Sequence, residues 1–180
     1  MLMALLYPKP DINDKINTLR KNASAQFDSL SKSLAAQNKR NAYIKYLIEN
    51  NRNLTLAQQL VDSDLMNTPK DEYYLVLKGQ IFAARMQYDS ALLEYNLAMQ
   101  RDSFPYALEE QAKTFIKLGK YDLAIADYRT AFNRNYDYSY LLATLFDSLQ
   151  RKDSAIKYYL IFTNHYPDPV IEKRIIILRK

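Results

Sequence analysis

Few side chains in this chain could do acid–base or nucleophilic chemistry, and their spacing does not favour it. The 180 residues contain no cysteine and one histidine, so thiolate catalysis, disulfides and the usual zinc ligand sets are excluded. Glu109 and Glu110 form a carboxylate pair, but adjacent helix residues point about 100° apart and do not flank one bond. His165 has no serine or thiol partner in view, and we expect it to interact with the dipole of a helix C-terminus.

The two glycines, Gly79 and Gly119, are too few for a glycine-rich phosphate loop or a dinucleotide-binding fingerprint. Such scarcity also argues against an all-β fold, whose tight turns need positive φ angles. No metal-ligand spacing occurs in the sequence. We therefore expect a mostly helical, non-catalytic protein with no catalytic residue, no cofactor and no metal.

The net charge of +5 does not predict a nucleic-acid-binding protein. The central part of the chain is nearly neutral, and the excess of basic residues lies toward the two ends, whereas nucleic-acid domains usually gather Lys and Arg on one face. The cations that end the chain are expected to offset the dipole of a terminal helix. They are Lys173, Arg174, Arg179 and Lys180.

Residues 1–10 form an apolar, proline-containing N-terminal segment. Met1 to Leu6 is far shorter than the ~20 residues that span a bilayer, so this chain is expected to contain no membrane span. It also fails as a complete signal peptide. Two interpretations stay open: an apolar terminus, or the end of a longer membrane anchor. The absence of cysteine fits both a reducing cytosol and an extracytoplasmic space, so the location is not predicted.

Residues 11–37 are predicted to form an amphipathic helix. The mean step between their apolar residues is near 3.7, which favours a helix lying on a partner surface over a left-handed coiled coil with a period of 3.5. That partner is either the first repeat of the same chain, which the helix would cap, or a second molecule, through which the chain would self-associate. The apolar residues are Ile12, Ile16, Leu19, Ala23, Phe27, Leu30 and Leu34.

Three later segments share a pattern of small and aromatic residues. Each has an alanine preceded two residues earlier by an aspartate and followed four residues later by a tyrosine. The aspartates are expected to cap helices, and the alanines to let neighbouring helices approach closely. The alanines are Ala91, Ala124 and Ala155; upstream small residues are Gly79, Ala112 and Ala143, each followed by Phe82, Phe115 or Phe146. Gly79 is expected at a tight helix crossing, and Gly119 in a turn with positive φ.

These segments resemble the tetratricopeptide repeat, a helix–turn–helix unit of 34 residues. The resemblance implies an all-α, right-handed superhelical solenoid with capping helices at both ends. The predicted parts are a degenerate repeat at 38–71, repeats at 72–104, 105–135 and 136–167, and a C-terminal capping helix at 168–180. The turn within the last repeat looks short.

The resemblance also implies that the first helix of each repeat lines a concave groove. The family's lysine, asparagine and arginine clamp for a chaperone's terminal carboxylate is not visible, because Tyr73, Gln80 and Glu109 occupy those positions. Two interpretations stay open for the tyrosines: they hold a peptide by stacking and hydrogen bonding, or they pack between helices. The expected groove residues are Tyr46, Tyr73, Gln80, Tyr106, Glu109, Lys113, Lys117 and Tyr140.

Lys113 and Lys117 are expected either to meet an acidic partner or to pair with Glu109 and Glu110 along their own helix. The predicted function is a non-catalytic scaffold or adaptor that binds a peptide or helix of a partner protein. Two alternatives are the sensor or assembly portion of a membrane-tethered complex, and the regulatory part of a longer signalling protein.

Overall fold

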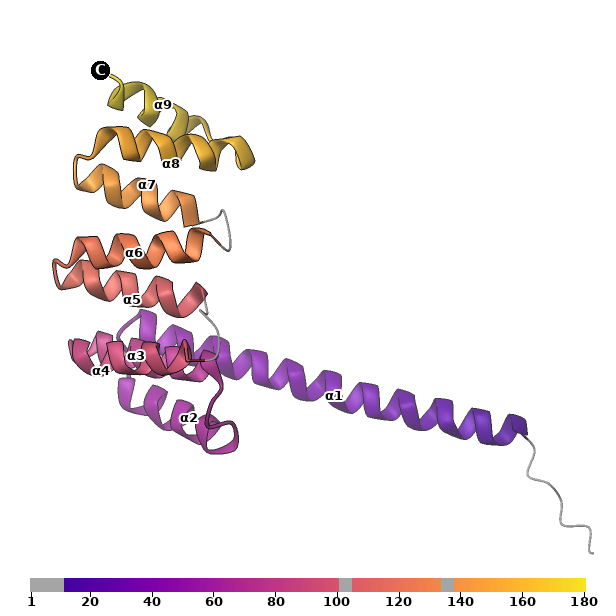
Figure 1. Ribbon diagram of the computed structural model, residues 1–180. Helices are drawn as coiled ribbons and strands as arrows, with labels where there is room; N and C mark the ends of the chain where they lie inside the picture. Colours follow the sequence, from indigo (N-terminus) through magenta and orange to yellow (C-terminus); the bar gives the residue numbers. More distant parts are fainter. Residues whose placement is uncertain (1–11, 101–104, 134–137) are drawn as a thin grey trace, which may run out of the picture. The chain divides into compact units, whose positions relative to one another are not determined.

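A computed structural model describes residues 12–100, 105–133 and 138–180, and in these ranges all regular structure is α-helical, with no strand (Figure 1). This confirms the expected all-α class of helical repeats. The predicted N-terminal segment 1–10 lies outside the described residues. The described helices are α1 (Ile12–Glu49), α2 (Leu54–Asn67), α3 (Glu72–Ala84), α4 (Tyr88–Ala98), α5 (Pro105–Lys117), α6 (Tyr121–Phe132), α7 (Tyr138–Ser148), α8 (Lys152–His165) and α9 (Pro169–Leu178).

Helix α1 is longer than the helix expected over residues 11–37. It continues without a break to Glu49, because no glycine or proline occurs along it. It ends where Asn51 adopts a positive φ of 49°. The chain divides into two compact units inside this helix, one ending at Tyr46 and the other running from Leu47 to Lys180. In the first unit, every residue from 15 to 36 is exposed.

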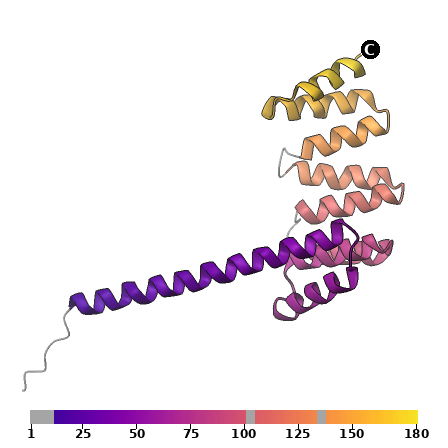
Figure 2. The same ribbon diagram turned by 180° about the vertical axis from the view of Figure 1, so that it is seen from behind.

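The second unit is a linear stack of helix pairs. Helices α3 and α4, α5 and α6, and α7 and α8 pack as pairs, and each second helix then packs on the first helix of the next pair. Helices α3 and α5 also touch directly. The pairs follow one another in chain order from α3 to α9 in both views (Figures 1 and 2). Each element therefore buries its apolar face on its neighbours in sequence, as repeat architectures do.

Small residues form the tightest contacts between the paired helices. Ala91, Ala124 and Ala155 are completely buried, as their shared position in the pattern predicts. A Cβ atom added to Gly79 would lie 2.4 Å from Cε1 of the buried Tyr95 ring on α4. The expectation of a tight helix crossing at Gly79 is confirmed, since only a residue without a side chain leaves room for that ring.

Four turns have the same hydrogen bonds: the three within the helix pairs and the one between α1 and α2. In each, the residue after a left-handed residue donates its N–H to a carbonyl five residues earlier, which is the Schellman arrangement. The donors and acceptors are Arg52 to Leu47 (2.8 Å), Gln87 to Phe82 (2.9 Å), Lys120 to Phe115 (2.8 Å) and Arg151 to Phe146 (2.9 Å). The left-handed residues are Asn51, Met86, Gly119 and Gln150.

The positive φ expected at Gly119 is confirmed at 71°. The expectation of a short turn in the last repeat was wrong, because the turn at Gln150 has the same pattern as the turn at Gly119. The sequence concealed this identity, since glutamine replaces glycine at the left-handed position.

The aspartates expected to cap the second helices lie inside them instead. Asp89, Asp122 and Asp153 occupy the first turns of α4, α6 and α8, whose N-cap residues make no side-chain cap hydrogen bond. Their carboxylates can still stabilise these helices through the positive end of the helix dipole. Side-chain caps occur at other helices: Asn53 caps α2, Asp71 caps α3 and Asp168 caps α9.

Candidate functional site

Two tyrosines at the same repeat position form the centre of the candidate site. Tyr73 lies in the first turn of α3, where its N–H donates to the Asp71 carboxylate at 3.0 Å. Tyr106 lies in the first turn of α5. Their ring centroids are 6.5 Å apart, with 22° between the ring planes, and the Gln80 amide donates to the Tyr106 oxygen at 2.8 Å. Stacking and this hydrogen bond fix the two rings across neighbouring repeats.

Both phenols stay protonated at neutral pH. Burial, followed by the nearby Glu110 carboxylate, raises the pKa of Tyr106 to about 12. Burial also raises the pKa of Tyr73, with smaller contributions from Tyr74 and Asp71. Neither phenol can therefore act as a ready base or nucleophile, and both offer neutral O–H groups for hydrogen bonding.

A charged cluster follows one turn along α5. The Lys113 ammonium lies 2.6 Å from the Glu109 carboxylate and 2.7 Å from the Glu110 carboxylate. Burial lowers the pKa of Lys113, but the hydrogen bonds to Glu109 and Glu110 outweigh it and hold that pKa above its usual value. Lys113 therefore pairs with glutamates along its own helix, which is one of the two interpretations that the sequence left open. Lys117, one turn further, is exposed and makes no ion pair with any residue that the structure describes.

Tyr140, another expected groove residue, does not join this cluster. Tyr140 on α7 packs against the second helix of its own pair, with ring centroids 5.2 Å from Phe162 and 6.3 Å from Tyr159. Tyr46 belongs to the other unit and has an exposed side chain. The site thus consists of Tyr73, Gln80, Tyr106, Glu109, Glu110 and Lys113, which we call the α3–α5 face.

Sequence reasoning missed the ion pairs between helices. Arg174 makes two hydrogen bonds to Asp147 of α7, at 2.8 Å and 2.7 Å, and the Tyr159 hydroxyl donates to the same carboxylate at 3.2 Å. The hydrogen bond from Arg174 is the largest of the effects that hold the pKa of Asp147 below its usual value. Arg174 was expected to offset the dipole of a terminal helix, but it lies before the last turn of α9, and its side chain fastens α9 to the last pair.

The ion pair between Lys78 on α3 and the buried Glu94 on α4, at 3.2 Å, was also missed. No sequence signal pointed to either pair, since the partners are 16 and 27 residues apart and share no helix. Both pairs hold packed helices together, so they belong to the scaffold that supports the α3–α5 face.

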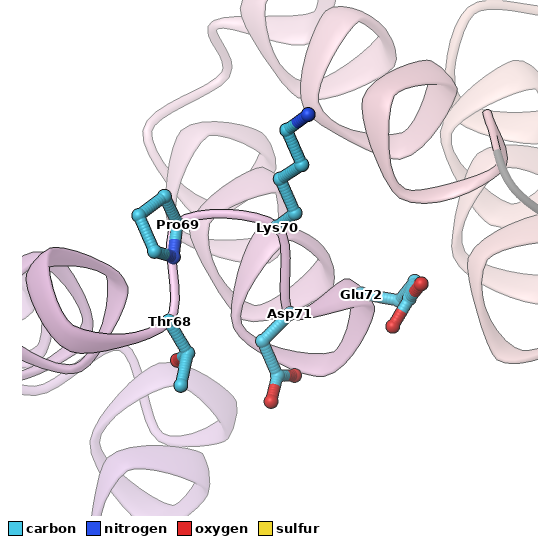
Figure 3. Close-up of a pocket in the computed structure, with 5 residues that line it drawn as sticks. All are labelled: Thr68, Pro69, Lys70, Asp71 and Glu72. Carbon is cyan, nitrogen blue, oxygen red and sulfur yellow. The ribbon is translucent and has the colours of Figure 1, made fainter.

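A surface depression of about 500 Å³ lies at the connection between α2 and α3. Asp71 is already used as a helix cap there, and Lys70 points away from the carboxylates of Asp71 and Glu72 (Figure 3). The lining residues are Thr68, Pro69, Lys70, Asp71 and Glu72.

The described part of the chain contains no group of three or more histidine, aspartate or glutamate side chains placed to hold a metal ion. None of its helices combines the length and the apolar character needed to cross a membrane.

Residues 109–163 match the family described as "Tetratricopeptide repeat". The matched segment runs from within α5 to within α8, and the match confirms the resemblance found in the sequence. A comparison with curated proteins gave no match. Tetratricopeptide repeats generally mediate protein–protein interactions and are typically non-enzymatic scaffolds, so protein partners are the general expectation for this array.

Proposed function

We propose that the chain is a non-catalytic adaptor that binds a segment of a partner protein, extended or helical, on the α3–α5 face. In the tetratricopeptide repeat, the first helices of the pairs line the concave surface, and α3 and α5 are such helices. The observation that carries the proposal is the stacked pair of Tyr73 and Tyr106, presented by successive repeats at the same position.

The chemistry of this face suits a partner side chain that is apolar or aromatic. The two rings are already held in place, so binding costs little side-chain entropy. Their neutral O–H groups can donate to backbone carbonyls of the bound segment. The carboxylates of Glu109 and Glu110 outnumber the Lys113 ammonium that they share, which favours a basic or neutral residue in the bound segment near this point.

The test is affinity capture with the intact chain and with a Tyr73→Ala/Tyr106→Ala variant, followed by calorimetry with fragments of each captured protein. The double variant is expected to weaken binding of the recognised fragment by at least about tenfold, as truncation of interface tyrosines does. A Tyr73→Phe/Tyr106→Phe variant separates stacking from hydrogen bonding, since it keeps the rings and removes only the hydroxyls.

A matched control is the Tyr121→Ala/Tyr166→Ala variant, which also removes two tyrosine rings but from exposed positions outside the α3–α5 face. It should bind like the unmodified chain. If the Tyr73→Ala/Tyr106→Ala variant keeps its helical content and retains every specific partner at full affinity, the proposed function is wrong.

A further inference from the structure

The exposed part of α1 presents an apolar stripe that is unusually regular. Ile16, Leu19, Phe27, Leu30 and Leu34 leave between 40% and 69% of their surface open, and Ala23 between them is exposed as well. Scattered apolar residues on a surface are ordinary, but a contiguous stripe of this kind usually marks an interaction site.

The stripe repeats every 11 residues. Ile16 and Phe27, Leu19 and Leu30, and Ala23 and Leu34 are each separated by this interval. An 11-residue period corresponds to 3.67 residues per turn, so two such helices can pair while nearly straight or with a slight right-handed supercoil. The next residues in the series, Asn38, Asn41 and Lys45, are polar, so the stripe ends after Leu34.

We propose that this stripe binds the same stripe of a second copy of the chain, with the two helices antiparallel. This inference is independent of the proposed function, because it uses only residues 15–36. We align the two antiparallel helices so that the midpoints of their stripes coincide. Residues that face each other across the dimer then have numbers that add up to about 50. Ile16 then meets Leu34 of the second copy, and Leu19 meets Leu30.

The sizes of the facing side chains favour this orientation. In the antiparallel register Ala23 faces Phe27 of the second copy, twice, so each large ring has a small residue opposite it. A parallel pair would instead place Phe27 against Phe27 and Ala23 against Ala23. The first contact would be overpacked and the second would leave a gap.

The charges beside the stripe favour the same orientation. Lys15 and Arg20 flank its N-terminal half, one on each side, whereas Ser31 and Ser33 flank its C-terminal half. In a parallel pair, Lys15 of each copy would lie against Arg20 of the other. Residues at these flanking positions form salt bridges in coiled coils, but here two positive charges would repel each other. An antiparallel pair sets these cations against serines.

The available area is sufficient for a specific dimer. The five large side chains expose apolar surface of roughly 500 Å² on each helix, so pairing would bury on the order of 1,000 Å², about the lower limit for a specific interface. The stripe from Ile16 to Leu34 is roughly 27 Å long at 1.5 Å per residue.

The first experiment measures mass by analytical ultracentrifugation of the full chain from about 1 to 100 µM. The unmodified chain is expected to dimerise in this range, and a Leu19→Glu/Leu30→Glu variant should weaken the dimer at least about tenfold. The matched control is Ala25→Glu/Ala36→Glu, which adds the same two charges at the same 11-residue spacing on exposed positions away from the stripe. It should dimerise like the unmodified chain.

The second experiment tests orientation, using the fact that the chain has no native cysteine. Ile16→Cys and Leu34→Cys are made in separate chains and mixed under mild oxidation. An antiparallel dimer gives mainly the mixed disulfide, whereas a parallel dimer crosslinks each variant to itself.

Several outcomes would overturn the inference. These are a monomer at all concentrations, a dimer that persists in Leu19→Glu/Leu30→Glu, an equal loss in both double variants, or crosslinking of each variant to itself. Binding of a monomer to anionic phospholipid vesicles, lost in Leu19→Glu/Leu30→Glu, would instead assign the stripe to a membrane surface.

Discussion

Single residues set how closely the helices of a pair approach. Gly79 is the clearest case, because its Cα faces the ring of Tyr95, which has no exposed surface. Alanine normally favours a helix over glycine by about 1 kcal/mol. Here the added methyl group would meet the ring at 2.4 Å, and a buried ring has little room to move.

Gly79→Ala is therefore expected to destabilise the array by about 1–2 kcal/mol, because overpacking outweighs the gain in helix propensity. Urea denaturation followed by circular dichroism measures the change. A Tyr95→Leu background is the control, since the smaller side chain should make the added methyl group nearly neutral or stabilising. Additive effects of the two substitutions would contradict the explanation.

Asp127 on α6 is a half-buried carboxyl whose charged form is disfavoured. Its Oδ2 atom has no hydrogen-bond partner among the described residues, and burial raises its pKa to about 7. The folded state therefore binds a proton that the unfolded state has already released between about pH 4 and pH 7. Stability should fall as the pH rises through this window and level off above it.

Asp127→Asn should remove this part of the pH dependence, since its amide does not titrate. At pH 4 the two proteins should be similarly stable; at pH 7.5 the variant should be more stable by about 1–2 kcal/mol, a value reduced for partial exposure of the carboxyl. Unfolding free energies at pH 4, 5.5 and 7.5 check this. Parallel pH profiles for the two proteins would show that Asp127 is not responsible.

At the scale of elements, the four equivalent turns show how one backbone geometry tolerates different residues. Only one of the four left-handed positions is glycine, at Gly119. Asparagine tolerates this conformation at Asn51, but Met86 and Gln150 are strained there, because a Cβ atom crowds the following carbonyl.

Met86→Gly and Gln150→Gly are each expected to stabilise the array by about 0.5–1 kcal/mol, since the relief of strain exceeds the entropy cost of glycine. Thermal denaturation of the single variants and the pair measures the gain. Gln87→Gly is the control, because its φ of −87° requires no glycine and the change should be neutral or destabilising. Equal effects at positions 86 and 87 would refute the strain argument.

The helix pairs could be predicted from the sequence because packing repeats the same residue types at the same positions. Ala91, Ala124 and Ala155 had to be small, and so they revealed the second helices. The continuity of α1 could not be predicted. The resemblance to a repeat implied that one helix ends at residue 37 and another begins at residue 38, but no residue there interrupts the helical backbone. The aspartate caps were misplaced by two residues, because a carboxylate in the first turn gives the same sequence signal as a cap.

The candidate site could be predicted only for residues whose neighbours follow from their position in the repeat. Tyr73 and Tyr106 share a position, and the structure stacks them. Tyr140 shares that region of its repeat but turns to Phe162, an aromatic residue where the preceding repeats have alanine. Phe162 thus gives the Tyr140 ring a contact within its own helix pair. This contact could not be predicted from the type of residue at position 140 alone.

At the scale of the whole molecule, the exposed half of α1 contributes little to the core. Residues 15–36 are exposed throughout, so they bury little apolar surface of their own. A chain that begins at Gln37 is expected to melt within about 2 °C of the full chain and to be monomeric. Differential scanning calorimetry and ultracentrifugation measure both properties. A large fall in melting temperature would mean that these residues support the repeats after all.

The turn geometry that the helix pairs share also bears on how the array could gain further repeats. A tandem copy of residues 87–119 inserted after Gly119 would start and finish at corners whose backbone path already exists in the chain. A complete unit could thus be added without inventing a new joint. The equivalent turns are therefore suitable insertion points for extra repeats, both in gene duplication and in laboratory engineering.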